Sequence, residues 1–312
     1  MAIKRIQELE FKKTLTALIY GQKGAGKTTL ALSSDQNCLL IDTGNGVDRV
    51  NEEHLLTAGF IQVKSYAEVV TDLQENAKDF TTIVVDTLGK LAEFMIEHVR
   101  QQSTKFCNTQ GGLSLQGWGV FNNTFKDFCR NIRMMNKNLI FVAHEVPEKR
   151  GDNTRLIPDV RANNYAILAT ELDLIGYIEC IGTERTISFS STSEHDGKNT
   201  GGFEHIIKIP LLKSGTPNDF FQQNIIKKHF ENVENKEKKQ EEVIMKFKQI
   251  DFMIENIVDS QTANNFVIEI NTIAHIGTSL QYAQTKFKDK IKTLNNVKYN
   301  KDTKLYEEVY NV

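Results

Sequence analysis

The chain has 312 residues, of which 40% are hydrophobic and 25% are charged, and its formal net charge is −2. This composition is ordinary for a soluble globular protein, and the length predicts one large domain plus an appendage. The near-neutral charge excludes a global electrostatic attraction to nucleic acid or membranes, so any nucleic-acid binding must come from a local patch.

The sequence predicts a soluble, cytoplasmic protein with no membrane partner. No apolar run approaches the length of a membrane span, and the first residues lack the apolar segment of a signal peptide. The four cysteines form no CxxC pair, so we expect them to be reduced, buried and inert.

Residues 21–28 form a phosphate-binding loop in the context that such a loop requires. They read Gly-Gln-Lys-Gly-Ala-Gly-Lys-Thr, a complete match to GxxxxGK[ST]. The apolar residues 15–20 lead into the loop as a strand, and residues 28–32 leave it as a helix. Glycines let backbone N–H groups surround phosphate oxygens, and the helix adds its positive N-terminus. The sequence therefore predicts that the chain binds a nucleoside triphosphate.

The side chains of this loop have separate predicted roles. Lys27 supplies a charge at the β- and γ-phosphates, and the Thr28 hydroxyl is a ligand for Mg²⁺. The predicted nucleotide-binding residues are Gly21, Gln22, Lys23, Gly24, Ala25, Gly26, Lys27, Thr28 and Thr29.

Downstream of the loop, short apolar runs alternate with helical patterns to about residue 210, which predicts an α/β fold. Three runs have the continuous hydrophobicity of strands in a parallel sheet, namely residues 37–42, 81–86 and 139–144. Later runs are expected to extend the sheet, with antiparallel pairing left open, at residues 172–178, 186–189 and 205–209.

The C-terminal part has a different pattern. Residues 231–242 are charged and poor in apolar residues, which predicts a linker or a solvated helix start at a domain boundary. Beyond them, apolar residues recur at spacings of three and four, as in amphipathic helices. We expect residues 1–230 to form the core and residues 243–312 a small helical region that serves packing or oligomerisation.

Asp86 ends an apolar strand, which is where P-loop proteins place the acid that orients Mg²⁺. Thr28 and Asp86 are therefore the predicted metal ligands. An aspartate that caps the following helix would give the same sequence, and the two roles can coexist.

Three more polar residues follow predicted strands. His144 and Glu145 end the fourth strand, and ligands of open α/β sheets lie at the carboxyl ends of strands, so this pair is expected to face the γ-phosphate. Either residue could sense the phosphate or position the attacking water, and the alternative is a loop histidine beside a solvated glutamate. Asp42, which ends the second strand, is the other candidate to activate water, and Asp48 is a more remote one.

Two basic segments are candidates for nucleic-acid contact. The first is a stripe on one predicted helix face, although such a stripe is usually only a solvated face, at Lys126, Arg130, Arg133 and Lys137. The second is a predicted loop at residues 148–155 and 161–165. Its basic residues and single aromatic suit single-stranded DNA, and they equally suit an ordinary surface loop.

In their order along the chain, these segments resemble the RecA-like P-loop ATPases encoded by phages, which are related to RecA and RadA and associated with single-strand annealing and recombination. The matching pieces are residues 19–29, 41–43, 84–88, 116–119, 141–145, 172–177 and 197–199. The resemblance covers roughly residues 10–215.

The resemblance implies a RecA-like core that binds ATP and Mg²⁺ between the subunits of a homo-oligomeric ring or filament. It also implies single-stranded DNA as a partner, together with phage recombination or replication proteins in the cytoplasm of the host bacterium. Lys198 matches the family lysine that reaches a neighbouring subunit's nucleotide, and an intramolecular surface role is the alternative. The arginine that follows this lysine in RadA-like proteins has no counterpart here.

One departure from the family pattern bears on turnover. Relatives often carry an acid and two glycines after the second strand, and the acid activates water, whereas Gly44 occupies that position here. Hydrolysis is therefore expected to be slow, with Glu145 or Asp42 as the substitute base. The expected catalytic residues are Lys27, Asp86, Glu145, His144, Asp42 and Lys198.

Three functions fit these patterns. The first is a slow, DNA-stimulated ATPase that acts on single-stranded DNA in recombination, annealing or replication. The second is a nucleotide-dependent assembly or binding module with little hydrolysis, which Gly44 favours. The third is a helicase loader or motor-type ATPase, which would require an arginine finger on a subunit edge.

Overall fold

The computed structural model describes residues 13–309, except residues 45, 51–57, 152, 161–164 and 214. The chain divides into two compact units, Lys12–Asn232 and a second that contains Val233–Val312. Among the described residues, no helix has both the length and the apolar character needed to cross a membrane.

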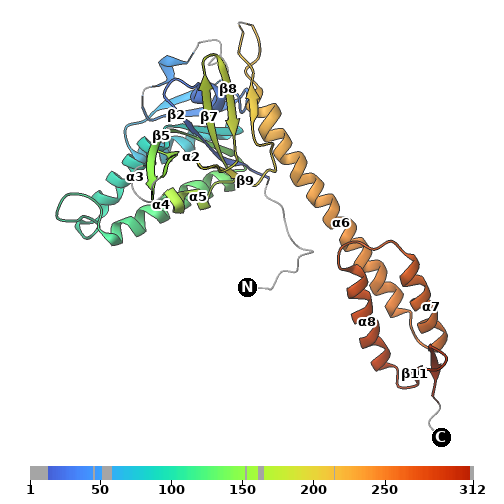
Figure 1. Ribbon diagram of the computed structural model, residues 1–312. Coiled ribbons are helices and arrows are strands. Elements are labelled where there is room, and N and C mark those ends of the chain that lie inside the picture. The colour runs from blue at the N-terminus through green and yellow to red at the C-terminus, as the bar shows by residue number, and fades with distance from the viewer. Residues whose placement is uncertain are drawn as a thin grey trace. The chain divides into compact units, whose positions relative to one another are not determined.

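A ten-stranded sheet forms the centre of the first unit (Figure 1). Its strands are β1 (Thr16–Gly21), β2 (Cys38–Asp42), β3 (Gly59–Gln62), β4 (Thr82–Asp86), β5 (Asn138–Arg150), β6 (Asn153–Pro158), β7 (Leu174–Ile181), β8 (Glu184–Ser188), β9 (Lys198–Asn199) and β10 (Ile207–Ile209). The order is β10-β8-β7-β1-β5-β4-β2-β3, while β6 pairs with β5 and β9 with β7. The neighbours from β7 to β3 are parallel, and β6, β8, β9 and β10 pair antiparallel. The predicted α/β fold with a mostly parallel sheet is confirmed.

The helices of this unit lie between its strands along the chain, and some of them begin at a side-chain cap. They are α1 (Lys27–Leu32), α2 (Tyr66–Asn76), α3 (Leu88–Gln102), α4 (Leu115–Met134) and α5 (Tyr165–Thr170), with short 3₁₀ turns at Val47–Arg49, Ala77–Asp79 and Thr104–Phe106. The hydroxyls of Ser65, Thr87 and Ser114 each accept a hydrogen bond from the backbone N–H three residues on, at the starts of α2, α3 and α4. These bonds satisfy N–H groups that have no partner inside the helix.

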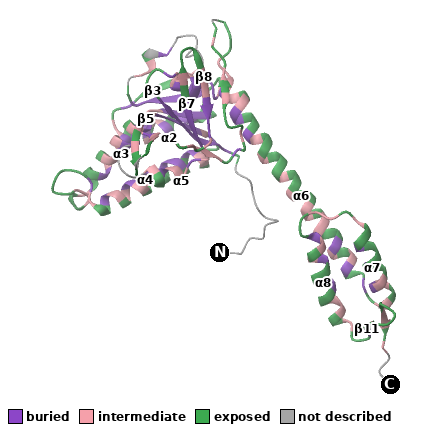
Figure 2. Cartoon of the chain, in the orientation of Figure 1, coloured by how far each residue is buried: buried purple, intermediate pink, exposed green. Residues whose placement is uncertain are grey.

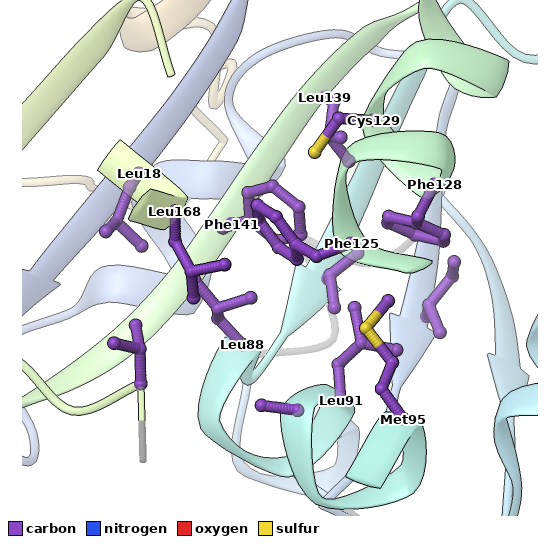
Figure 3. Close-up of a cluster of buried hydrophobic side chains, with 14 of the residues drawn as sticks. Leu18, Leu88, Leu91, Met95, Phe125, Phe128, Cys129, Leu139, Phe141 and Leu168 are labelled. Atoms are coloured by element: carbon purple, nitrogen blue, oxygen red, sulfur yellow. The ribbon is translucent and has the colours of Figure 1, made fainter. Parts of the chain in front are cut away.

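The strands are buried on both faces because alternate residues point into two different cores (Figure 2). On one face, Leu18 and Phe141 pack against side chains from α2 to α5 (Figure 3). The ring of Phe125 in α4 stacks on Phe141 with centroids 5.7 Å apart. On the other face, Ile19 packs against α1 and against Phe221, which precedes a π-helical turn at Gln222–Ile226. The sheet is therefore the middle layer of three.

The prediction of a loop after the fourth strand is wrong for residues 148–155, because these residues form a β-hairpin. β5 continues past the residues that pair with β1 and β4 and then pairs antiparallel with β6, from Glu145 opposite Pro158 to Arg150 opposite Asn153. Gly151 has φ 64°, the left-handed conformation that a tight turn requires. Residues 161–164 of the predicted loop lie outside the described residues.

The second unit is helical, with a small hairpin at its end that the sequence patterns did not predict. A long helix, α6 (Lys227–Glu255), enters it, and α7 (Ser260–Thr272), α8 (Ser279–Thr293), β11 (Val297–Asn300) and β12 (Leu305–Glu308) follow. Its core includes Ile250, Phe266 and Phe287. The charged residues 231–242 lie inside α6, mostly in exposed positions, and Glu and Lys are good helix formers.

The four cysteines form no disulfide. Cys38 and Cys129 are buried, as the sequence predicts, whereas Cys107 and Cys180 are partly exposed. Burial raises the pKa of the Cys38 thiol to about 12, so this thiol is protonated at neutral pH.

Candidate functional site

A cavity of about 900 Å³ opens at the carboxyl ends of the central strands. The phosphate-binding loop forms one side of it through Lys23, Gly24, Gly26, Lys27, Thr28 and Thr29. The ends of β2, β4 and β5 add Asp42, Asp86 and His144. The structure therefore brings most of the predicted site residues to one place, at the edge of the sheet where ligands of α/β proteins lie.

Backbone conformation gives the phosphate-binding loop its shape. Gly24 and Gly26 have φ of 80° and 90°, values that L side chains rarely adopt. At Gly21, a Cβ atom would lie 2.3 Å from the carbonyl oxygen of Ile178 in β7, so only glycine fits. α1 begins directly after Gly26, which directs its N-terminus toward the loop.

Lys27 is buried within the loop. Its Nζ donates hydrogen bonds to the carbonyl oxygens of Gly21, at 2.9 Å, and Gln22, at 2.5 Å. Burial lowers the pKa of the Lys27 ammonium, while the negative charges of Asp86 and Glu145 favour its protonated form. The ammonium is thus held at the cavity by two carbonyl groups that carry no full charge.

Thr28 and Asp86, the two predicted metal ligands, are in contact. The Thr28 hydroxyl donates a hydrogen bond of 2.5 Å to Oδ2 of Asp86. Thr43, which follows β2, fixes the end of β4, because its hydroxyl donates to the Asp86 carbonyl oxygen at 2.9 Å and accepts from the Thr87 N–H at 2.8 Å. Two oxygen ligands of the kind that Mg²⁺ prefers therefore lie side by side on this flank of the loop.

The carboxylate of Asp42 organises the segment that follows β2. Its Oδ1 accepts hydrogen bonds from the backbone N–H groups of Gly44, at 3.1 Å, and Gly46, at 3.0 Å. Its Oδ2 accepts from the Val47 N–H at 3.1 Å, where a 3₁₀ turn begins. Both oxygens of this candidate base therefore already accept bonds from the protein.

His144 and Glu145 have different surroundings. His144 lines the cavity, whereas Glu145 is not one of the lining residues. Burial raises the pKa of the Tyr177 hydroxyl in β7, and the nearby negative charge of Glu145 raises it further. Oε2 of Glu145 is buried without a hydrogen-bond partner. Among the described residues, it is the one buried carboxylate oxygen without a hydrogen-bond partner.

Lys198 lies away from the cavity of its own chain. It is in β9 opposite Ile175, near the amino end of β7, and its Nζ donates to the carbonyl oxygen of Ala169 at 2.9 Å. This contact is the intramolecular alternative that the sequence left open. A role for Lys198 at a neighbouring subunit's nucleotide stays a prediction.

Most of the basic side chains singled out for nucleic acid make contacts within the chain. Arg130 pairs with Asp127 and Arg133 with Glu171, at 2.8 and 2.9 Å. Lys137 is buried, and its Nζ donates to the carbonyl oxygens of Lys78 and Phe80. Arg155 of β6 pairs with Asp196 at 2.6 Å. Lys126 and Lys149 are exposed.

Sequence reasoning missed one wall of the cavity. It consists of Arg185 in β8, Ile209 at the end of β10, the three residues that follow it (Pro210, Leu211 and Leu212), and Asn218 and Phe220. No sequence motif marks these residues. They come together at the cavity only because β8 pairs with β10, which places Arg185 opposite Ile209. The wall is mostly apolar, which suits the nucleoside part of a nucleotide.

The residues present fit a nucleoside triphosphate with Mg²⁺. The loop glycines and Lys27 suit the phosphates, the adjacent Thr28 and Asp86 oxygens suit the metal, and the apolar wall suits the base. Mg²⁺ commonly takes only one or two protein carboxylates and completes its shell with phosphate and water, so the small number of ligands is sufficient.

A protein-family model described as an AAA domain matches residues 13–200, which is more than half of the chain. The matched range contains the phosphate-binding loop and every predicted site residue, and it ends before the helical unit. No curated protein matches the chain. An AAA domain indicates a nucleotide-binding ATPase, in agreement with the cavity. The chain belongs to the AAA domain family.

Proposed function

We propose that this chain is a RecA-like ATPase that binds ATP with Mg²⁺ and acts on single-stranded DNA in phage recombination, annealing or replication. The observation that carries the ATPase part is the contact between Thr28 and Asp86 beside the buried Lys27, at the edge of a cavity of about 900 Å³. The proposed action on DNA, the phage context and the assembly into a ring or filament are based on the resemblance of residues 10–215 to phage-encoded RecA-like ATPases.

The side chains at the cavity would have different roles toward the phosphates of the nucleotide. Lys27 can exchange its two carbonyl partners for phosphate oxygens, because only neutral acceptors hold its ammonium. Thr28 and Asp86 would hold Mg²⁺, which when bound neutralises charge on the phosphates. His144 lines the same cavity and can bond the terminal phosphate or the attacking water.

The contacts of the two carboxylates support slow turnover. A general base must reach the proton that it removes, and it needs an oxygen available to accept that proton. Asp42 lines the cavity, but three backbone N–H groups occupy its oxygens. Glu145 has an unsatisfied buried oxygen but does not line the cavity. Neither residue meets both conditions without a local rearrangement.

The course of β5 supports a link between nucleotide and DNA. This strand carries His144 at the cavity and then continues without interruption into the β5–β6 hairpin, where Lys149 is exposed. A change at the terminal phosphate could therefore reach the hairpin along one strand. We propose the hairpin as the DNA-binding element of an oligomer.

An ATPase assay with and without single-stranded DNA tests the proposal. We expect slow basal hydrolysis that DNA accelerates, and loss of both ATP binding and turnover in Lys27→Ala. Lys64→Ala, an exposed lysine before α2, is the matched control and should behave as the wild type. Unchanged nucleotide affinity and turnover in Lys27→Ala would remove the assignment of this loop.

A nucleotide-dependent assembly module with little hydrolysis is the second candidate, and the occupied oxygens of Asp42 favour it. Light scattering with an ATP analogue, Mg²⁺ and single-stranded DNA separates the two. Assembly without measurable turnover supports the module. A protein that stays monomeric in this mixture, or Lys198→Ala with normal turnover in it, contradicts the picture in which Lys198 acts across a subunit boundary.

A further inference from the structure

We infer that Arg185 is a phosphate-binding residue that the chain supplies to its own nucleotide, on the flank of the phosphate-binding loop opposite the metal ligands. The inference rests on the proposed function, because it assumes that the cavity holds a nucleotide. It adds a binding residue that no sequence motif marks, and it names the phosphates that this residue holds.

Arg185 is attached to the phosphate-binding loop. It stands in β8, lines the cavity and is partly buried, and its Nε donates a hydrogen bond of 3.2 Å to the carbonyl oxygen of Ala25. A Cβ atom on Gly26 would lie 3.4 Å from the same nitrogen, so the guanidinium packs against the turn of the loop. Because Nε faces the loop, the two Nη groups are left for another acceptor.

Among the described residues, Arg185 differs from the other arginine side chains in that it has no carboxylate partner. Four other arginine side chains that the structure describes each pair with a carboxylate, and these are Arg100, Arg130, Arg133 and Arg155. Arg185 forms no such pair with any described residue, although Glu184 beside it does, with Lys208. A partly buried guanidinium without a carboxylate, at a cavity that already suits phosphate, fits an anionic ligand.

The order of the strands places this charge opposite the metal ligands. β1, which leads into the phosphate-binding loop, lies between β7 and β5. Asp86 stands beyond β5, at the end of β4, while Arg185 stands beyond β7, in β8. A polyphosphate on the loop would therefore meet the metal ligands on one flank and a guanidinium on the other.

The neighbours of Arg185 indicate which phosphates it holds. The backbone of such a loop cradles the α- and β-phosphates, and Ala25 and Gly26 belong to that backbone. Ile209 pairs with Arg185 across the sheet and leads into the apolar wall that suits the nucleoside. Arg185 thus lies between the loop and the nucleoside wall, whereas Asp86 and His144 mark the other end. We assign it to the α- and β-phosphates, which ATP and ADP share.

Equilibrium binding of ATP and ADP to three variants tests this assignment. Arg185→Ala should weaken both nucleotides about 10- to 100-fold, and by the same factor, because one or two charge-assisted hydrogen bonds are lost. Arg185→Gln keeps an amide donor for the Ala25 carbonyl but removes the charge, and it should lose nearly as much. Arg185→Lys keeps the charge and should lose less.

Lys208→Ala is the control, since this exposed lysine lies next to Ile209 and pairs with Glu184 outside the cavity. It should bind both nucleotides as the wild type does, and thermal unfolding of every variant verifies the fold. If Arg185→Gln and Arg185→Lys bind the nucleotides with equal affinity, the charge of Arg185 does not contribute to binding, and the residue only supports the loop through the Ala25 carbonyl. Loss of ATP binding alone would place it at the γ-phosphate, and wild-type binding by Arg185→Ala would overturn the inference. A wild-type protein that binds no nucleotide would instead refute the proposed function.

Discussion

The hydroxyl of Thr28 donates a hydrogen bond of 2.5 Å to Oδ2 of Asp86, which joins the start of α1 to the end of β4. The two residues are 58 positions apart in the sequence. In the sheet, β5 lies between β4 and β1, the strand that leads into the loop before α1, so this contact joins elements that are not sheet neighbours. It makes the hydroxyl and the carboxylate a preformed pair rather than two ligands that must be brought together.

Removing one oxygen of this pair should change the dependence on metal. Thr28→Val keeps the shape of the side chain but removes the hydroxyl, so we expect half-maximal turnover to need about tenfold more Mg²⁺. Thr28→Ser keeps the hydroxyl and should stay close to the wild type. A magnesium titration of ATP hydrolysis measures both, and identical titrations for Val and Ser would argue that Thr28 is not a metal ligand.

Asp42→Asn should destabilise the fold. The amide group keeps one acceptor oxygen and loses the other, so at least one of the three N–H bonds from Gly44, Gly46 and Val47 is broken. We expect the free energy of unfolding to fall by about 1–3 kcal/mol, measured by urea denaturation. Asp48→Asn, an exposed position in the next 3₁₀ turn, should have no effect. If the variant has normal stability but impaired turnover, Asp42 acts as the base that activates water and not as a structural residue.

Glu145→Gln tests the other substitute base. The variant keeps the size of the side chain but loses the carboxylate whose Oε2 is unsatisfied, so turnover should drop while ATP affinity stays. Single-turnover hydrolysis beside equilibrium ATP binding separates these effects. If this variant and Asp42→Asn both hydrolyse ATP at the wild-type rate, neither carboxylate is the base.

Gly44→Glu should accelerate hydrolysis. A Cβ atom at Gly44 would meet nothing within 4 Å, and the residue lines the cavity, so the acid that relatives carry at this position can be accommodated. We expect kcat to rise at least about tenfold, since a well-positioned general base contributes roughly 10²–10⁴-fold. Gly44→Gln has the same size without the carboxylate and should show no gain. Equal rates for the two variants would refute the explanation of slow turnover by Gly44.

Alkaline pH should destabilise the protein through its buried tyrosines. Burial raises the pKa of Tyr66 from 10.0 to about 12, and burial also raises that of Tyr20. Since the folded pKa exceeds the unfolded one, the native state retains these protons, and their stabilising contribution is complete below pH 10.0 and decreases as pH rises toward about 12. Tyrosinate absorbance should therefore show a late step that Tyr66→Phe reduces. A Tyr66 that ionises together with exposed tyrosines would contradict its burial.

The parts that could be predicted from the sequence are those in which neighbouring residues act together. The phosphate-binding loop is eight consecutive residues, and Asp86 follows an apolar run whose hydrophobicity places it in the sheet. The bonds of Asp42 could not be predicted, because they depend on how residues 44–47 fold back. Arg185 reaches the site only because β8 pairs beside β7, and its neighbours along the chain do not show this.

β1 pairs with a parallel strand on each side, β5 and β7, and its residues are fully buried. Its amide hydrogens can therefore exchange with solvent only when the sheet itself opens, and they should be among the slowest in the chain. In the loop that follows, Gln22, Lys23 and Gly24 are exposed. The nucleotide would thus bind to a partly exposed loop that is joined directly to a strand buried on both sides, so that the slowly exchanging β1 and the binding site are adjacent along the chain.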